Sequence, residues 1–187
     1  MVTIILAEGF EPMEAIVPCD ILRRGGVEVQ LAGLGGTRIR AAHTITVEAD
    51  CTVEELRPEA SELIMLPGGM GGVNAMLESP AVLRLVREAA ERDVLLAAIC
   101  AGPLVLSRCG LLAGKRITCY PGCQAQMPEC VYTGGQTQRD GRILTGEAPG
   151  AATEFGLALL EALRGAEAEQ AVRAQLVYSR NGGAHVR

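Results

Sequence analysis

The sequence is poor in aromatic residues, which fill 3% of its 187 positions and include no tryptophan. It also lacks the basic stripe and aromatic cluster of a nucleic-acid-binding protein, so no nucleic-acid partner is expected. No apolar run is long enough to cross a membrane, and Val2–Ala7 is too short, and lacks the basic flank, for a signal peptide. With 49% apolar residues, 21% charged residues and a net charge of −5, the chain is not disordered. Its core must consist of Leu, Val, Ile and Ala, which suits helices packed closely on a parallel sheet.

Histidine is nearly absent as well, with His43 and His185 its two occurrences. A Cys-His hydrolase needs an imidazole that can reach the sulfur. His185 lies in the polar tail, and His43 could reach a site only from an excursion of the chain or across a dimer interface. The scarcity of histidine therefore disfavours a cysteine protease.

Secretory features are lacking, and the seven cysteines are an odd number. A disulfide framework is therefore not expected, and the protein is predicted to be cytoplasmic. Cys119, Cys123 and Cys130 lie close together in the sequence but lack the paired Cys-x2-Cys spacing of a structural zinc site, so no metal is expected. Metal handling by these three cysteines is an alternative that predicts stoichiometric metal in the purified protein.

What the sequence does contain is a regular alternation of strand and helix patterns. Short apolar runs predict strands, while amphipathic stretches that start at prolines and end at glycines predict helices. Alternating units with short links predict one α/β domain over residues 1–187, with a mostly parallel, doubly wound sheet and a flexible tail over 178–187. Strands are expected at 2–7, 27–32, 63–66, 94–99 and 116–119, hairpins at 37–48 and 137–145, and helices at 12–24, 80–91, from the Cys100 corner to about 109, at 153–163 and at 166–174.

Three loops are expected to meet at one edge of this sheet. They are Ala7–Glu14 after the first strand, Pro67–Gly72 after the third strand, and the turn at Cys100 after the fourth. Ligands of such sheets gather at the carboxyl ends of the strands. The three loops therefore define the candidate site.

Cys100 follows the buried run Val94–Ile99 and precedes a small-small-Pro sequence that can open a helix. A cysteine at such a corner has its sulfur beside the backbone N–H groups of a helix N-terminus, and we expect their field to favour the thiolate, which is the nucleophile. The alternative is a small buried hydrophobic residue, since most free cysteines have that role.

Glu14 and the glycines after the third strand are the candidate partners of Cys100. Glu14 lies one turn into the first helix among apolar neighbours, where desolvation would raise its pKa to that of a general acid or base. The alternative for Glu14 is a surface charge on an amphipathic helix. Gly68 and Gly69 let the backbone approach a substrate and offer N–H donors for an oxyanion, or else form a simple turn. Their spacing matches neither a phosphate-binding loop nor a dinucleotide fingerprint.

Several segments together resemble the ThiJ/PfpI superfamily, in the branch of the Parkinson-disease-associated deglycase and bacterial YajL. The similarity extends from the first strand to about Val177. The combination of a glutamate on the first helix, a Leu-Pro-Gly-Gly turn and an Ala-Ile-Cys-Ala-Gly-Pro corner is specific. The matching segments are Ile5–Ala7, Glu11–Glu14, Asp20–Arg24, Leu66–Gly69, Ala97–Pro103, Ile143–Thr145 and Ala148–Gly150.

The resemblance implies a flavodoxin-like fold with a nucleophile elbow at Cys100. Glu14 would match the family glutamate that hydrogen-bonds the cysteine sulfur, and the N–H groups of Gly69 and Ala101 would match its oxyanion pocket. Family members are usually homodimers and need no cofactor. Activities attributed to this branch are glutathione-independent glyoxalase, deglycase, redox sensing through a sulfinic cysteine, and chaperone activity.

Two residues depart from family patterns. Protease-like members have a histidine directly after the cysteine, where this chain has Ala101, so a peptidase is disfavoured. Near relatives have a histidine at the position of Tyr120, and a tyrosine with a pKa of roughly 10 is a poor base near neutral pH. Glu14 is thus the best-placed base, with Tyr120, His43 and Pro149 as further candidate residues of the pocket. Cys119 and Cys123 add thiols near the pocket that the family pattern does not explain.

The sequence therefore predicts a cofactor-free glyoxalase or deglycase in which Cys100 adds to an α-oxoaldehyde and Glu14 moves a proton between adjacent carbons. Gly68, Gly69 and Ala101 would bind the oxyanion or substrate. Its partners would be a small aldehyde and a second copy of the chain. The alternative is an oxidative-stress sensor or redox-regulated chaperone, in which Cys100 is oxidised without turnover.

Overall fold

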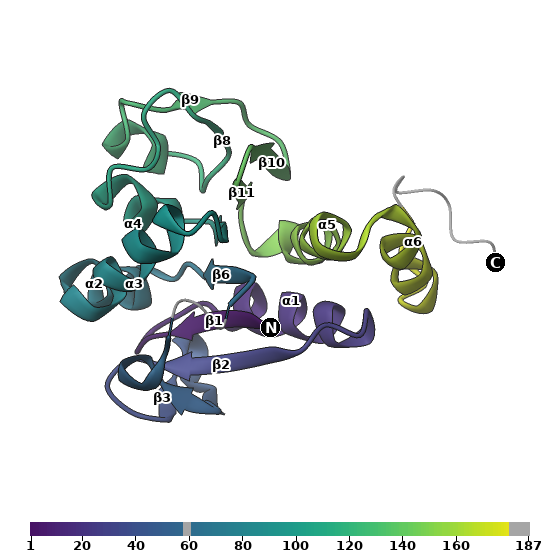
Figure 1. The fold of residues 1–187 in the computed structure, drawn as a ribbon, viewed down its shortest axis with the longest axis horizontal. Helices are drawn as coiled ribbons and strands as arrows, with labels where there is room; N and C mark the ends of the chain where they lie inside the picture. Colours follow the sequence, from purple (N-terminus) through teal and green to yellow (C-terminus); the bar gives the residue numbers. More distant parts are fainter. Residues whose placement is uncertain (58–60, 180–187) are drawn as a thin grey trace.

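The fold is a seven-stranded, mostly parallel sheet between two groups of helices, as seen in a computed structural model that describes residues 1–57 and 61–179 (Figure 1). The strand order is β10-β11-β7-β6-β1-β2-β5, and only β10 runs antiparallel to its neighbour. The strands are β1 (Val2–Leu6), β2 (Val29–Gly33), β5 (Cys51–Thr52), β6 (Leu63–Leu66), β7 (Leu95–Ile99), β10 (Thr137–Asp140) and β11 (Ile143–Gly146).

Burial explains why the central strands are continuous apolar runs. All residues of β1, β6 and β7 are buried, as expected for parallel strands covered on both faces. The chain adds β2 on one side of β1 and then β6, β7 and β11 on the other side, so the strand order switches between β1 and β6. Ligands of doubly wound sheets bind outside the carboxyl ends of the strands at such a switch point. The predicted doubly wound sheet with helices on both faces is confirmed.

The helices cover the sheet in two groups. In Figure 1, α2, α3 and α4 lie on one side, and α1, α5 and α6 on the other. Helix α1 starts at the proline predicted to open it, and the side chain of Glu11 accepts a hydrogen bond from the Met13 N–H as its cap. The helices are α1 (Pro12–Arg24), α2 (Met70–Glu78), α3 (Pro80–Glu91), α4 (Pro103–Arg108), α5 (Ala152–Arg164) and α6 (Ala166–Gln175).

Both expected hairpins are present. The excursion consists of β3 (Arg38–Arg40) paired with β4 (Thr46–Glu48), and the second hairpin is β10 with β11 around Asp140-Gly141. The strand expected at 116–119 is shorter: β8 (Arg116–Ile117), which pairs with β9 (Val131–Tyr132) in a separate small sheet. The expected tail from 178 lies largely outside the described residues, which end at 179.

Helix α2 was not expected, because Pro67–Gly72 was predicted to be a loop. Its glycines do not break the helix. They permit close packing instead: a Cβ at Gly71 would lie 3.1 Å from the Gly9 Cα, and one at Gly72 would lie 2.9 Å from the Phe10 Cα. The glycines thus let α2 lie directly against the loop that follows β1.

Within residues 1–57 and 61–179, no helix combines the length and apolar character needed to span a membrane.

Candidate active site

One cavity of about 320 Å³ lies where the loops after β1, β6 and β7 meet. The structure therefore brings together the three loops that the sequence placed at this edge. The backbone links them, since the Glu11 N–H donates to the Gly68 carbonyl over 3.0 Å. The cavity is lined by Glu11, Glu14, Gly69, Met70, Cys100, Ala101, Tyr120, Cys123 and Pro149.

Cys100 occupies the sharp corner between β7 and α4. Its φ is +64°, in the left-handed region that non-glycine residues rarely adopt. The corner is fixed from both sides: the Cys100 N–H donates to the Gly146 carbonyl over 3.0 Å, and the Tyr120 N–H donates to the Cys100 carbonyl over 2.9 Å. Such strain persists where the surrounding structure enforces it, and here it leaves Cys100, 9% exposed, facing the cavity.

Glu14 reaches the same corner from α1 and is completely buried. Its Oε2 atom accepts a hydrogen bond from the Gly68 N–H over 2.8 Å, while Oε1 accepts none from any N–H or O–H group of the described residues. Burial raises the pKa of Glu14 from 4.5 to about 7, although hydrogen bonds with Cys100 and Gly68 act in the opposite direction. Glu14 is therefore a buried acid that titrates near neutral pH, rather than a surface charge.

The pKa of Cys100 differs from the sequence-based expectation. Burial, followed by the charge and the hydrogen bond of Glu14, raises it from 9.0 to about 12, and the N–H groups of Ala101 and Gly69 offset only part of this increase. The shift is opposite to the one expected from the sequence, because burial and the charge of Glu14 outweigh the hydrogen bonds from the Ala101 and Gly69 N–H groups.

Glu14 and Cys100 form a coupled acid pair. Since the pKa of each group is raised and Glu14 carboxylate raises that of the thiol, the pair keeps one proton well above neutral pH. When that proton is on Glu14, the negative charge is on the sulfur, beside the N–H groups of Gly69 and Ala101. The pair can thus exchange a proton while the amides support either a thiolate or an oxyanion.

The two glycines after β6 have different roles in this geometry. A Cβ at Gly68 would lie 2.5 Å from Glu14 Oε2 and 2.7 Å from Cys100 Cβ, so no side chain fits between the acid and the thiol. The Gly68 N–H is taken up by Glu14, which leaves Gly69 and Ala101 as the amide donors at the sulfur. Gly69 has a φ of +83°, a conformation that suits glycine.

The other candidate pocket residues fall into two groups. Tyr120 and Pro149 line the cavity, and Tyr120 is 49% exposed. His43 does not line it. Its side chain is 76% exposed, and its Nε2 atom lies 3.5 Å from Glu11 Oε2, so His43 borders the site through Glu11.

Glu11, Met70 and Cys123 also line the cavity. Cys123 was expected near the pocket, whereas Glu11 and Met70 were expected only as members of the loops that meet here. Glu11 is also the N-cap of α1, and this position next to Glu14 brings its side chain to the cavity. Met70 is the first residue of the unexpected α2. Cys123 starts a short 3₁₀ turn, Cys123–Gln126, whose position depends on tertiary contacts that no local pattern reveals.

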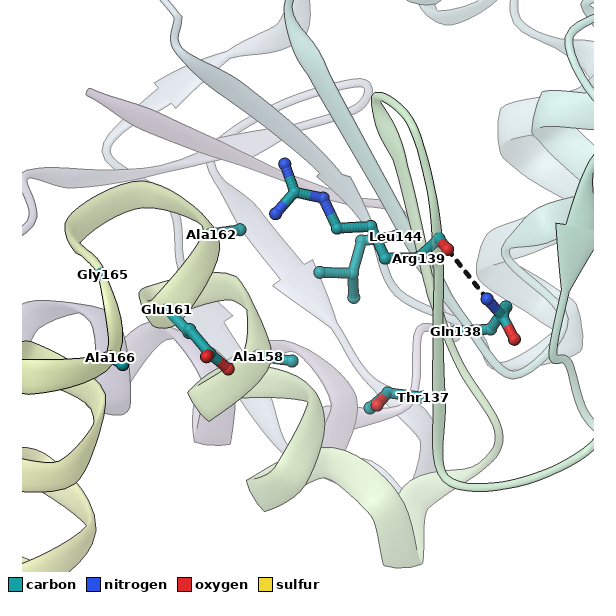
Figure 2. A pocket seen from close by; sticks show the side chains of 9 residues that line it. All are labelled: Thr137, Gln138, Arg139, Leu144, Ala158, Glu161, Ala162, Gly165 and Ala166. Atoms are coloured by element: carbon teal, nitrogen blue, oxygen red, sulfur yellow. Dashed lines mark hydrogen bonds between the residues drawn. The ribbon is translucent and has the colours of Figure 1, made fainter.

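A larger cavity of about 490 Å³ lies at the β10 edge of the sheet, between β10 and α5 (Figure 2). Its charged residues are Arg139 and Glu161, and its walls contain no cysteine. Figure 2 shows Gln138 donating to the Arg139 carbonyl within the strand, over 2.8 Å. Because this cavity contains no thiol and its one acid, Glu161, is exposed, the smaller cavity at Cys100 is the better candidate site.

Fold and corner together define a flavodoxin-like α/β protein with a cysteine at a strand-to-helix elbow and a buried glutamate beside it. Residues 1–162 match the model of the DJ-1/PfpI family. The chain belongs to this family, which confirms the resemblance seen in the sequence.

Characterised relatives cover nearly the whole chain. It is 35% identical over 179 residues to a Danio rerio protein named Parkinson disease protein 7 homolog, covering 93% of this chain and 95% of the relative. It is 32% identical over 162 residues to the Caenorhabditis elegans glutathione-independent glyoxalase DJR-1.2, covering 86% of each. The crystal structure of Drosophila melanogaster DJ-1beta superimposes with a TM-score of 0.91 at 36% identity, covering 95% of this chain and 97% of that one.

Proposed function

We propose that the protein is a cofactor-free, cysteine-dependent enzyme that converts α-oxoaldehydes such as methylglyoxal to hydroxy acids. The main support is the buried Glu14 carboxyl beside Cys100, with one oxygen free of N–H and O–H partners at the wall of the cavity. The glyoxalase name of the Caenorhabditis elegans relative supports the same activity.

The first step is addition of the Cys100 sulfur to the aldehyde carbon. Glu14 accepts the thiol proton and returns it to the aldehyde oxygen, which gives a hemithioacetal. The N–H groups of Gly69 and Ala101, which point at the sulfur, stabilise the negative charge on that oxygen. A pKa of about 7 lets Glu14 both accept and donate this proton near neutral pH.

The second step moves a proton between two carbons. Glu14 removes the proton from the carbon bonded to sulfur and delivers it to the adjacent carbonyl carbon, while the hydroxyl proton of the hemithioacetal passes to the oxygen of that carbonyl. The product is a thioester of Cys100 next to a new hydroxyl group. Water then hydrolyses the thioester, so the net reaction is aldehyde plus water to hydroxy acid. One carbon is oxidised while its neighbour is reduced, so the reaction requires no external electron acceptor, and in this proposal Cys100 supplies the thiol.

The test is turnover of methylglyoxal by metal-free protein without glutathione, measured as lactate formed. Cys100→Ser should lower kcat/KM by at least about 10³-fold, because the nucleophile is lost. Cys109→Ser is the matched control: its sulfur contacts the Leu83 carbonyl at 3.7 Å and lies away from the cavity. Full turnover by Cys100→Ser would contradict the proposal.

A deglycase activity would use the same groups. Adducts of methylglyoxal with amines carry the same two-carbon unit, and release of the amine after attack by Cys100 would lead to the same thioester. Purified adduct, free of released aldehyde, should then yield lactate at a rate that an aldehyde trap does not reduce. If the trap abolishes lactate formation, the enzyme acts on free aldehyde alone.

An oxidative-stress sensor or redox-regulated chaperone is the second candidate. The observation that favours it is the Glu14 acid beside Cys100, since a protonated carboxyl can donate a short hydrogen bond to a sulfinate. Intact-mass spectrometry after mild peroxide treatment distinguishes the two functions. Selective gain of two oxygens at Cys100, together with negligible aldehyde turnover, would favour the sensor.

A homodimer in the cytoplasm is also part of the proposal. Helix α1 exposes two large apolar side chains, Met13 at 50% and Ile16 at 39%, and Ile45 is 48% exposed. Seven free cysteines suit a reducing compartment. Light scattering should give twice the chain mass for the wild type. Ile16→Asp, which places a charge on this exposed apolar side of α1, should shift the protein to monomers.

A further inference from the structure

Cys123 is a second thiol in the active-site cavity, and the proposed reaction does not use it. All seven cysteines lie in the described part of the chain, and of these only Cys100 and Cys123 line the cavity. Each is 9% exposed. The cavity therefore holds two thiols accessible to a small molecule.

A short series of backbone hydrogen bonds connects these two cysteines. The Tyr120 N–H donates to the Cys100 carbonyl, and the Cys123 N–H donates to the Tyr120 carbonyl, each over 2.9 Å. Cys123 is thus attached to the Cys100 corner through one intervening residue, although the two are far apart in the sequence.

The neighbouring cysteines are placed differently. The Cys119 sulfur is fully buried and accepts a hydrogen bond from the Gln124 N–H. The Cys130 thiol donates to the Met127 carbonyl over 3.0 Å. Neither lines the cavity, so Cys123 is the member of this cluster that shares the cavity with Cys100.

We propose that Cys123 is a resolving cysteine: after a hydroperoxide oxidises Cys100 to a sulfenic acid, Cys123 condenses with it to form a reversible Cys100–Cys123 disulfide. The disulfide would block the cavity and protect Cys100 from irreversible oxidation.

The chemistry balances in two steps. The Cys100 thiolate attacks the hydroperoxide, its sulfur takes the terminal oxygen as the O–O bond breaks, and an alcohol or water leaves after protonation. The Cys123 sulfur then attacks the sulfenic sulfur: an S–S bond forms, the S–O bond breaks, and the departing hydroxide takes a proton to become water. Glu14, hydrogen-bonded to Cys100, is placed to give that proton, and the proton lost by Cys123 restores its acid form. A dithiol reductant reverses the disulfide by exchange.

Closing the disulfide requires the turn that carries Cys123 to approach the Cys100 corner. Disulfides need Cα atoms about 4.4–6.8 Å apart, and the Cys100 corner is held between β7 and α4. The turn is better able to move, because Tyr120 and Gly122 are exposed and Gly122 has a φ of +100°. Glycine at this position lets the backbone change its direction at little cost.

The experiment is treatment of reduced protein with two molar equivalents of hydrogen peroxide, followed by thiol alkylation and mass spectrometry without reduction. The wild type should lose two hydrogens and give one cross-link between the tryptic peptides 93–108 and 117–139, and dithiothreitol should reverse it. Because the second peptide contains three cysteines, Cys119→Ser and Cys130→Ser should keep the cross-link while Cys123→Ser and Cys123→Ala abolish it. In the Cys123 variants, Cys100 should instead gain two oxygens. Circular dichroism confirms that each variant is folded.

Two results would overturn the proposal. One is a wild type in which Cys100 gains two oxygens while Cys123 stays fully alkylated. The other is a cross-link that survives Cys123→Ser, which would assign it to Cys119 or Cys130. The proposal needs an oxidisable Cys100 but no aldehyde turnover, so lactate formation and the cross-link test the two proposals separately.

Discussion

Glu14 and Cys100 share a buried corner in which the charge and hydrogen bond of Glu14 make the thiol harder to ionise, whereas the hydrogen bond of Cys100 makes the carboxyl easier to ionise. The pKa of Glu14 is about 7 and that of Cys100 about 12, and burial is the largest cause of both shifts. At the scale of single residues, the properties of the site therefore depend on whether Glu14 or Cys100 holds the shared proton, and measurements at different pH values should reveal this.

Glu14 should make the protein less stable as pH rises. In the unfolded chain its pKa is near 4.5 and in the folded protein about 7, so the folded state binds more protons between these values. The stability that this group contributes is full below pH 4.5 and is lost as pH rises through 7, by an amount on the order of 3 kcal/mol. Urea unfolding of Glu14→Gln from pH 4.5 to 8 should lack this decrease, whereas the exposed Glu78→Gln should keep it. Parallel curves for Glu14→Gln and the wild type would contradict the pKa shift.

Glu14→Gln should also separate thiol reactivity from turnover. Glu14 raises the pKa of Cys100 through its charge and its hydrogen bond, so the variant should alkylate Cys100 at least several-fold faster at pH 8. It should nevertheless lose lactate formation by about 10²–10⁴-fold, because the amide cannot transfer a proton. Iodoacetamide rates from pH 6 to 10, with Cys100→Ser as the background, measure the first effect. Slower alkylation in the variant would show that Glu14 activates the thiol rather than suppressing it.

Gly68→Ala should disrupt the same pair by contact. The added methyl group would lie 2.5 Å from Glu14 Oε2 and 2.7 Å from Cys100 Cβ, so one of these groups must move. Displacement of a reacting group by about 1 Å can cost 10²-fold in rate, and we expect a decrease in kcat of about that size. Gly150→Ala is the matched control, since its Cβ meets nothing within 4 Å. Equal turnover by both variants would show that the corner tolerates a side chain.

At the scale of elements, the sequence predicts best where a local signal is strong. Helix α1 begins at Pro12 and α3 at Pro80, as expected, because proline at the first helical position needs no hydrogen-bond partner. The buried strands β6 and β7 were likewise found from their apolar runs. Helix α2 was missed because its glycines are explained by contacts with residues far away in the sequence, namely Gly9 and Phe10.

The same distinction applies to the candidate site. Cys100 and Glu14 were found because strand ends and apolar neighbours mark them locally. The raised pKa of Cys100 could not be anticipated, because it depends on the burial of the corner and on a carboxyl brought in from α1. Cys119 and Cys123 were both expected near the pocket, but only the structure shows that Cys123 lines it, because a 3₁₀ turn outside the main sheet positions this residue.

Ser79 should stabilise the start of α3. Its side chain accepts a hydrogen bond from the Val82 N–H over 3.3 Å, which satisfies one of the free donors at the helix N-terminus. Ser79→Ala should therefore lower the free energy of unfolding by about 1 kcal/mol, whereas Ser79→Asp, which can accept the same bond, should preserve it. Denaturant unfolding measures both variants. Equal losses in the two would show that the serine acts through something other than its cap.

At the scale of the whole molecule, the site draws on residues from Glu11 to Pro149. Its parts come from both groups of helices and are joined through one sheet. Segments far apart in the sequence are linked as well. Arg164, the last residue of α5, donates two hydrogen bonds of 2.8 and 3.0 Å to the Glu62 carboxylate, and Glu62 Oε1 also lies 3.2 Å from the N-terminal amine. We therefore expect that a change that destabilises one part of the molecule also lowers the stability of the other parts.

The chain should consequently unfold as one unit, as the predicted single domain over residues 1–187 requires. Helix content by circular dichroism, exposure of Cys100 to alkylation and loss of turnover should share one thermal midpoint, and calorimetry should give one transition. Added dithiothreitol keeps the free thiols reduced during the scan. Turnover that is lost well before helix content would instead indicate a separately unfolding site region.

The hydrogen bond from the Cys100 N–H to the Gly146 carbonyl also bears on how the protein is made. On the ribosome, Cys100 emerges well before β11, so the acceptor that fixes its corner does not yet exist. Translation proceeds at roughly 5–20 residues per second, and the delay lasts seconds. During that interval Cys100 is an ordinary thiol on an unfinished chain, and its special chemistry begins only when the last parallel strand of the sheet has been synthesised.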